Sequence, residues 1–72
     1  MKYKLKVRKP FGTVLDEDGR TVLGDWVTVL AGSIVEHITI GSWDMVLVKY
    51  TDRYDKVCYG WVFLDEVEEI KA

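Results

Sequence analysis

The chain holds one histidine and one cysteine, a pair of residue types that can combine in nucleophilic catalysis. A catalytic pair needs its two side chains in contact and a third group that orients the base. No pattern around His37 or Cys58 indicates that contact, and one imidazole with one thiol is too few for a zinc site. We therefore expect a polar strand histidine and a buried thiol. The sequence predicts no enzyme: no catalytic residue, no metal site and no cofactor.

A second candidate for chemistry is the acidic run Asp16-Glu17-Asp18, which precedes Gly19. Carboxylates are calcium ligands, but a calcium loop alternates them over a longer stretch that ends in glutamate. That spacing is absent here. Asp followed by Gly is instead a strong signal for a tight turn. We interpret the run as the solvated tip of a hairpin.

Basic residues recur at every second position near the start of the chain: Lys2, Lys4, Lys6 and Arg8. This row has two interpretations. It would bind phosphates or an acidic protein surface, or it is the solvated face of the first strand. The acidic segment 65–69 offers counter-charges for the second interpretation, which we favour because exposed ion pairs are worth little individually.

Length and composition place the chain among small globular domains. Its 72 residues suffice for one domain, spanning 1–72, and 49% of them are hydrophobic. A formal net charge of −2 argues against nucleic-acid binding. A single cysteine permits no internal disulfide, and the start of the chain lacks the apolar stretch of a signal peptide. We therefore expect a cytoplasmic protein without a membrane-spanning segment.

The pattern predicts an all-β fold of five or six short antiparallel strands. In residues 2–8 the alternation assigns Leu5 and Val7 to the core, and Pro10 is expected to end that strand. A small hairpin that joins residues 13–15 to residues 21–23 is expected in place of a long first loop, with Gly24-Asp25 breaking the chain after it. The further predicted strands are residues 27–30, 34–40, 43–50, 57–62 and 67–70. Residues 51–56 form an exposed tip, and a single helical turn is expected around 64–66.

Four short motifs resemble the bacterial SH3 domain. They are Leu5-Lys6-Val7-Arg8, the segment 29–36 with its Leu-x-Gly core, Trp43-Asp44-Met45-Val46-Leu47-Val48, and Gly60-Trp61-Val62. This resemblance implies a small SH3-like barrel that binds a partner and catalyses no reaction.

The resemblance also implies where a ligand would bind. Trp43 takes the place of the groove tryptophan of peptide-binding SH3 domains, and Trp61 and Phe63 fall where that groove has an aromatic residue and a proline. Glu66 replaces an expected tyrosine, and Arg8 and Pro10 stand for further aromatics, so polyproline recognition is not expected. Two further aromatics are candidates on residue type alone, because binding hot spots are rich in Trp and Tyr: Trp26 and Tyr54.

These observations lead to a non-enzymatic module that docks on a cytoplasmic protein, as an adaptor or an inhibitor. The docking face is expected beside the first hairpin and the 51–56 tip. Short, free-standing chains of this kind are common in phage and other mobile elements. Two alternatives stay open: recognition of the cell wall or peptidoglycan, which the resemblance implies, and nucleic-acid binding by a small barrel. The sequence does not predict the oligomeric state.

Overall fold

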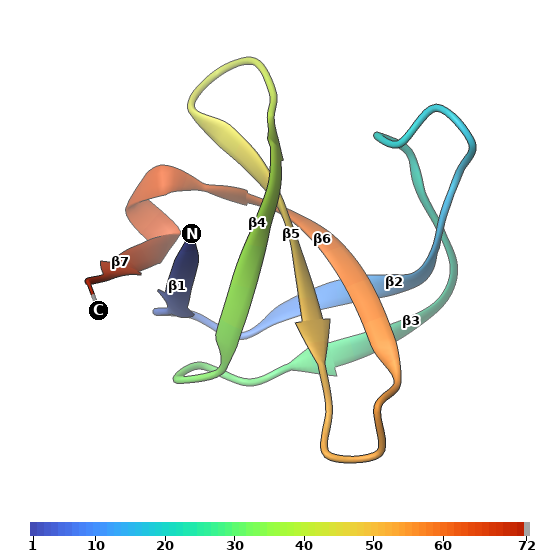
Figure 1. Cartoon of the computed structure of the whole chain (residues 1–72), viewed down its shortest axis with the longest axis horizontal. Helices are drawn as coiled ribbons and strands as arrows, with labels where there is room; N and C mark the ends of the chain where they lie inside the picture. The colour runs from blue at the N-terminus through green and yellow to red at the C-terminus, as the bar shows by residue number, and fades with distance from the viewer. Residues whose placement is uncertain (72) are drawn as a thin grey trace.

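A computed structural model describes residues 1–71, which form seven β-strands and one 3-10 turn (Figure 1). The elements are β1 (Lys2–Leu5), β2 (Lys9–Leu15), β3 (Val22–Val29), β4 (Ile34–Ile40), β5 (Met45–Thr51), β6 (Val57–Phe63), η1 (Leu64–Glu66) and β7 (Val67–Ile70). The prediction of an all-β chain with one helical turn near its end is confirmed. Over residues 1–71, the structure holds no helix with the length and apolar character needed to cross a bilayer.

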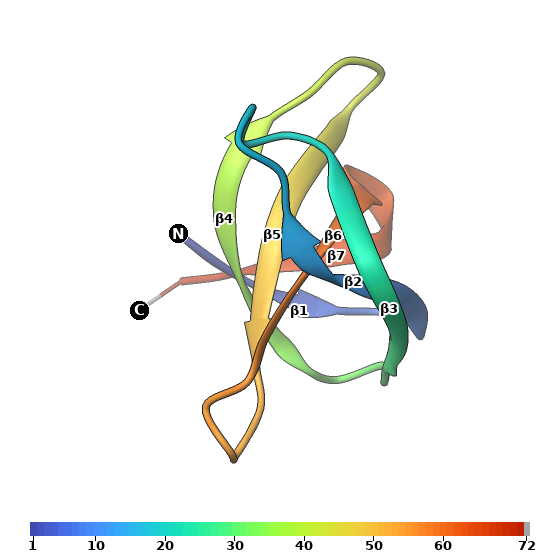
Figure 2. The same cartoon turned by 90° about the vertical axis from the view of Figure 1, so that its right-hand side faces the viewer.

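All seven strands belong to one antiparallel sheet in the order β3-β2-β6-β5-β4-β1-β7. The sheet is strongly curved, so that β4 and β5 cross β2 and β3 at a steep angle (Figures 1 and 2). The hydrogen-bond pattern of the described residues does not join β3 to β7, and the sheet is open there.

The prediction of five or six strands is wrong, because the first hairpin contributes two long strands to the sheet. Gly24-Asp25 does not interrupt β3, which runs for 8 residues. Its register against β2 shifts between Gly12 and Val14, and Gly24 adopts a φ of 92°. A bulge of this kind bends a strand without ending it, and glycine permits the positive φ.

The first strand is shorter than the alternation predicts. Leu5 is held on one side, where its N–H donates to the carbonyl of Ser33 and its own carbonyl accepts from Gly32. Beyond Leu5 the chain bends away from the sheet, and Val7 is 42% exposed, so its assignment to the core is wrong. Pro10 does not end the strand either, because it lies inside β2.

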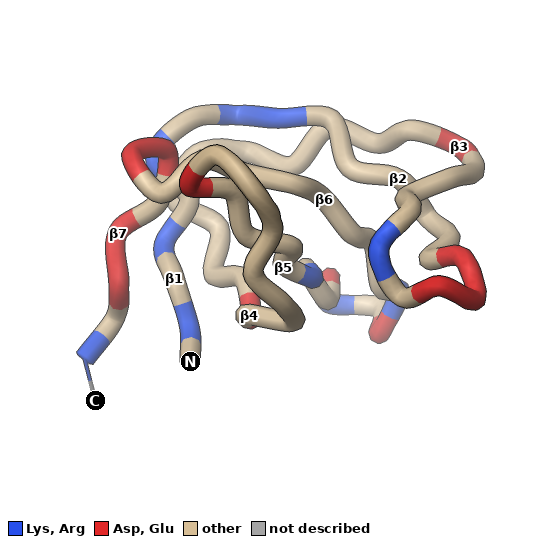
Figure 3. Tube along the Cα trace, turned by 90° about the horizontal axis from the view of Figure 1, so that it is seen from above, with Lys and Arg blue, Asp and Glu red and all other residues tan. Residues whose placement is uncertain are grey.

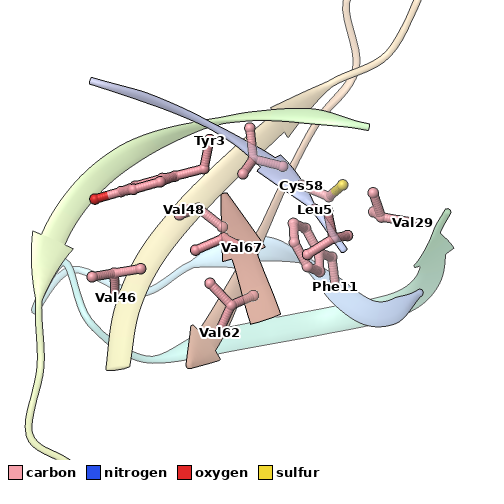
Figure 4. Close-up of a cluster of buried hydrophobic side chains, with 10 residues drawn as sticks. Tyr3, Leu5, Phe11, Val29, Val46, Val48, Cys58, Val62 and Val67 are labelled. Atoms are coloured by element: carbon pink, nitrogen blue, oxygen red, sulfur yellow. The ribbon is translucent and has the colours of Figure 1, made fainter. Parts of the chain in front are cut away.

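The core lies between the crossing halves of the sheet (Figure 4). Its fully buried side chains include Leu5, Phe11, Val35, Val48 and Val62. Leu47 is also fully buried but lies outside this cluster, because it points to the opposite face of β5 from Val48. The prediction that this strand is buried on both faces is therefore confirmed for residues 46–48.

The basic row and the acidic end of the chain lie side by side on β1 and β7 (Figure 3). Lys4 is directly opposite Glu68, and Lys2, Lys6 and Arg8 are exposed. The ion pairs within residues 1–71 lie elsewhere, between Lys9 and Glu66 and between Lys49 and Glu36. The acidic segment therefore lies beside the basic first strand, where it was expected to offer counter-charges.

Candidate partner-binding surface

Trp43 is the most exposed large apolar side chain among the described residues, at 87%. The sequence predicted that Trp43 opens a strand, but β5 starts at Met45. Trp43 and Asp44 instead form the turn between β4 and β5, with φ angles of 60° and 58°. The N–H of Met45 donates to the carbonyl of Ser42 over 3.2 Å and closes this turn. Left-handed residues at both central positions suit the twist of a hairpin, and aspartate tolerates this conformation better than tryptophan does, so the strain falls mainly on Trp43.

Trp61 lies beside this turn and is held in one orientation. Its indole N–H donates to the carbonyl of Arg20 over 2.7 Å. The Arg20 guanidinium lies 5.7 Å from the ring centroid and donates to the carbonyl of Ile40 over 3.2 Å. The ring also covers Gly41, where a Cβ atom would overlap it. These contacts fix the first hairpin against β4 and β6.

Two hollows flank Trp43. The first has a volume of about 360 Å³ and is lined by Arg20, Gly41, Ser42, Trp43, Met45 and Trp61. The second has a volume of about 350 Å³ and is lined by Trp43, Asp44, Phe63, Leu64 and Asp65. We call the two hollows together with Trp43 between them the Trp43 surface. It brings together three residues that the sequence nominated for partner binding: Trp43, Trp61 and Phe63.

Phe63 is 43% exposed, and its position is set by Glu66. One carboxylate oxygen of Glu66 accepts from the Phe63 N–H over 2.9 Å and from Lys9 Nζ over 2.7 Å. Lys9 Nζ in turn lies 5.7 Å from the centre of the Phe63 ring. Burial opposes ionisation of Glu66, but these two hydrogen bonds and the charge of Lys9 outweigh it and hold its pKa below the ordinary value. Glu66 therefore supports the surface from within.

The other two nominated aromatics lie elsewhere. Trp26 is 61% exposed on β3, and Tyr54 is 72% exposed at the tip between β5 and β6, with Arg53 stacked 5.4 Å from its ring centre. That tip lies at the opposite end of β5 from the Trp43 turn (Figure 1). The first hairpin and the 51–56 tip, which were expected to lie beside one docking face, are therefore on different parts of the molecule. Only the hairpin, through Arg20, lines the Trp43 surface.

The acidic run forms a turn in the first hairpin, as predicted. Asp18 accepts hydrogen bonds from the hydroxyl of Thr21 and from the backbone N–H groups of Arg20 and Thr21. These bonds, with a contribution from the Arg20 charge, lower the pKa of Asp18 from 3.8 to about 2. All of these hydrogen bonds stay within the turn, so the Asp18 carboxylate stabilises the turn that positions Arg20.

His37 and Cys58 contact different groups. The His37 ring lies beside Tyr3, with Nδ1 3.4 Å from the phenolic oxygen. The Cys58 thiol is buried and donates weakly to the carbonyl of Tyr50. Burial, with a smaller contribution from Asp52, raises the pKa of that thiol, which disfavours the reactive thiolate. Within residues 1–71, no three His, Cys, Asp or Glu side chains gather as a metal site would require.

Sequence reasoning missed Arg20, Gly41, Met45 and Leu64 as parts of this surface. The Gly41-Ser42 pair was a turn signal, and a reading that extended the turn through Asp44 would have placed Trp43 at its tip. Arg20 carried no local signal, because its contact with Trp61 spans 41 positions of the chain.

No protein-family model matches this chain, and neither do the curated proteins or the solved structures with which it was compared.

Proposed function

We propose that this protein is a non-enzymatic module that docks on a cytoplasmic protein through the Trp43 surface, as an adaptor or an inhibitor. The observation that carries the proposal is Trp43 itself, an indole 87% exposed on a turn with two successive left-handed residues. Strained backbone of this kind concentrates at functional sites, and tryptophan is among the residue types most enriched in binding hot spots.

Part of the surface is held in place before any partner arrives. The Trp61 indole donates to the Arg20 carbonyl, and the backbone N–H of Phe63 donates to Glu66. A partner therefore loses little free energy in ordering the Trp61 side chain, which is the advantage of a preorganised site. The ring of Trp43 divides the surface into two slots of similar size, so an apolar side chain on each side of the indole would fill it.

The charges at the rim favour one class of partner. Asp44 and Asp65 line the second hollow, and both are exposed. A protein segment that combines apolar side chains with Lys or Arg would complement this rim, whereas a phosphate backbone would be repelled. Arg20 lines the first hollow, so the acidic part of the rim is that of the second hollow, and there it supports a protein partner over a nucleic acid.

We also propose that the curved sheet is an SH3-like barrel in its architecture. Three features support this proposal: the pairing of β1 with β7, the crossing of β2 and β3 over β4 and β5, and the 3-10 turn immediately before the last strand. In such an architecture the Trp43 surface lies between the first hairpin and the β4–β5 turn. The single free thiol, Cys58, is consistent with a reducing compartment.

The test compares Trp43→Ala with Tyr54→Ala, because both side chains are exposed and they lie at opposite ends of β5. Tagged wild-type protein and both variants are used to capture proteins from the cells that make the chain. Each candidate is then purified and titrated by calorimetry, and dispersed amide resonances verify that the variants fold. We expect a partner bound equally by wild type and Tyr54→Ala, with Trp43→Ala losing about 2 kcal/mol or more, roughly 30-fold in Kd.

Two outcomes would contradict the proposal. One is a folded Trp43→Ala variant that binds its partner as tightly as wild type. The other is a Trp43-dependent ligand of another class, revealed when the protein sediments with purified peptidoglycan or shifts DNA or RNA in a gel with strong salt dependence.

A further inference from the structure

Strand β3 forms one end of the sheet and is an unguarded edge. It is 8 residues long, six consecutive residues from Leu23 to Thr28 are exposed, and its only charged residue is Asp25. The other end of the sheet is different, because β7 has 4 residues and carries Glu68 and Glu69. Proteins normally protect edge strands by shortness, charge, proline or a bulge, since an exposed edge pairs with other chains. On β3 these devices are confined to the bulge at Gly24 and to Asp25, and residues 26–29 have none of them.

The backbone groups of β3 are directed toward this open edge at Trp26 and Thr28. Thr28 lies opposite Pro10, which has no N–H and cannot belong to a fully hydrogen-bonded pair. Antiparallel pairs alternate between hydrogen-bonded and non-hydrogen-bonded types. The pair of Trp26 with Gly12 is therefore of the same type as the pair of Thr28 with Pro10. Gly12 meanwhile pairs with Tyr59 of β6 on its other side. Trp26 and Thr28 are left with N–H and C=O groups that point away from the sheet.

An apolar hollow of about 280 Å³ lies against the same part of β3. Val27 and Val29 line it from β3, and Tyr50, Val57 and Cys58 line it from the β5–β6 hairpin. The tip of that hairpin projects past β3 (Figures 1 and 2). A strand added to the free edge would thus run over the projecting hairpin, and its inward side chains would meet the hollow.

We propose that the occupant is a second copy of this chain, added through its own β3 in an antiparallel, two-fold pairing centred on Val27. This register pairs residues 25–29 with their counterparts and avoids the bulge at Gly24. It places Trp26 opposite the second copy's Thr28. It also places Asp25 opposite the second copy's Val29, so the only charge on the strand never faces its equivalent. The segment can therefore pair with itself through its outward backbone groups without bringing like charges together, as an isologous interface requires.

The inference does not depend on the proposed function, because the Trp43 surface is built from other elements. In the paired form both Trp43 surfaces remain free, and the protein would present two of them. The assembly then gains avidity for any partner with two matching sites.

The experiment measures molar mass by sedimentation equilibrium over a range of concentrations. One chain has a mass of 8.3 kDa, and we expect the wild-type mass to double as concentration rises. Thr28→Pro removes an outward N–H without removing a bond to β2, and it should keep the mass of one chain throughout. Thr28→Val preserves the N–H and the shape, and as the matched control it should still double its mass.

A second variant covers the case in which Thr28→Pro fails to fold. Val27→Lys places a charge on the free edge at a side chain that is already 42% exposed, and we expect a folded protein of single-chain mass. Hydrogen exchange at the Trp26 and Thr28 amides should also slow as the wild-type concentration rises.

A wild-type mass of one chain at millimolar concentration would overturn the proposal. So would an assembly that survives Val27→Lys but is lost when Glu69→Lys alters the opposite edge.

Discussion

Lys9 and Glu66, 57 positions apart in the chain, form an ion pair in which Nζ lies 2.7 Å from Oε1. The pair connects the start of β2 to the 3-10 turn that follows β6. Because the same carboxylate also accepts from the Phe63 N–H, one side chain joins three segments beneath the Trp43 surface.

Replacing this carboxylate should weaken the protein in a pH-dependent way. Glu66→Gln removes the charge, and we expect a loss of about 1 kcal/mol at neutral pH because the pair is partly shielded from solvent. The pKa of Glu66 is lowered from 4.5 in the folded state, so its contribution is complete above that value and disappears as pH falls through the lower folded-state pKa. Urea unfolding of both proteins from neutral pH into acid measures this. A stability difference that stays constant across that range would contradict it.

The carboxyl of Asp18 should titrate far below its ordinary range. NMR titration is expected to give a pKa of about 2, and Thr21→Val should move it toward 3.8 because the strongest of the three hydrogen bonds is lost. Since the folded-state pKa is depressed, Asp18 stabilises the hairpin above pH 3.8, and this contribution falls as pH drops toward 2. A pKa for Asp18 that is indifferent to Thr21→Val would show that the hydroxyl does not set it.

Relieving strain at the β4–β5 turn should stabilise the protein while it removes the anchor. Left-handed backbone costs roughly 1–2 kcal/mol at a residue with a side chain, whereas glycine loses about 0.5–1 kcal/mol through its greater freedom when unfolded. Trp43→Gly is therefore expected to gain up to about 1 kcal/mol of stability in urea unfolding and to lose the partner. Ser42→Gly is the control, because Ser42 does not have a positive φ, and it should gain nothing. A less stable Trp43→Gly variant would mean that the indole itself supports the fold.

Truncating side chains at the start of the chain should cost far more stability at Leu5 than at its neighbours Lys6 and Val7. Leu5 has no exposed surface, and Leu5→Ala should cost about 2–5 kcal/mol. Val7→Ala should change stability by no more than about 0.5 kcal/mol, as is usual for exposed side chains. Lys6→Ala should behave like Val7→Ala. Chemical denaturation compares all three, and an equal loss for Leu5 and Val7 would mean that both are core residues.

Local sequence patterns predicted most elements of this fold. The β-branched run 34–40 became β4, the polar segment 51–56 became an exposed tip, and the turn at 64–66 appeared where expected. The misassignment of Val7 has a physical reason. Alternation indicates which face of a strand a side chain occupies, but it does not indicate whether another segment covers that face. Here the segment with Gly32 and Ser33 forms backbone hydrogen bonds with Leu5 but not with Val7.

The candidate site was predictable in part. The two residues nominated on residue type alone, Trp26 and Tyr54, lie elsewhere. The resemblance to the groove of peptide-binding SH3 domains nominated Trp43, Trp61 and Phe63. Their grouping required the tertiary structure. Trp43 reaches the surface only because the turn adopts two left-handed residues, and Trp61 is oriented only because the first hairpin brings the Arg20 carbonyl to its N–H. Neither the turn conformation nor this hydrogen bond produces a periodic pattern in the sequence.

The pairing of β1 with β7 has a kinetic consequence. Its register pairs Lys2 with Ile70, so this ladder closes a loop of almost the whole chain. The other neighbour of β1 is β4, which is also distant from it in the sequence. The hairpins β4–β5 and β5–β6 close much shorter loops. Because loop-closure entropy must be lost before distant contacts form, the two hairpins should assemble early and the β1–β7 ladder last, with overall folding in milliseconds to seconds. Substitutions that weaken the β1–β7 ladder should then accelerate unfolding and leave the folding rate nearly unchanged.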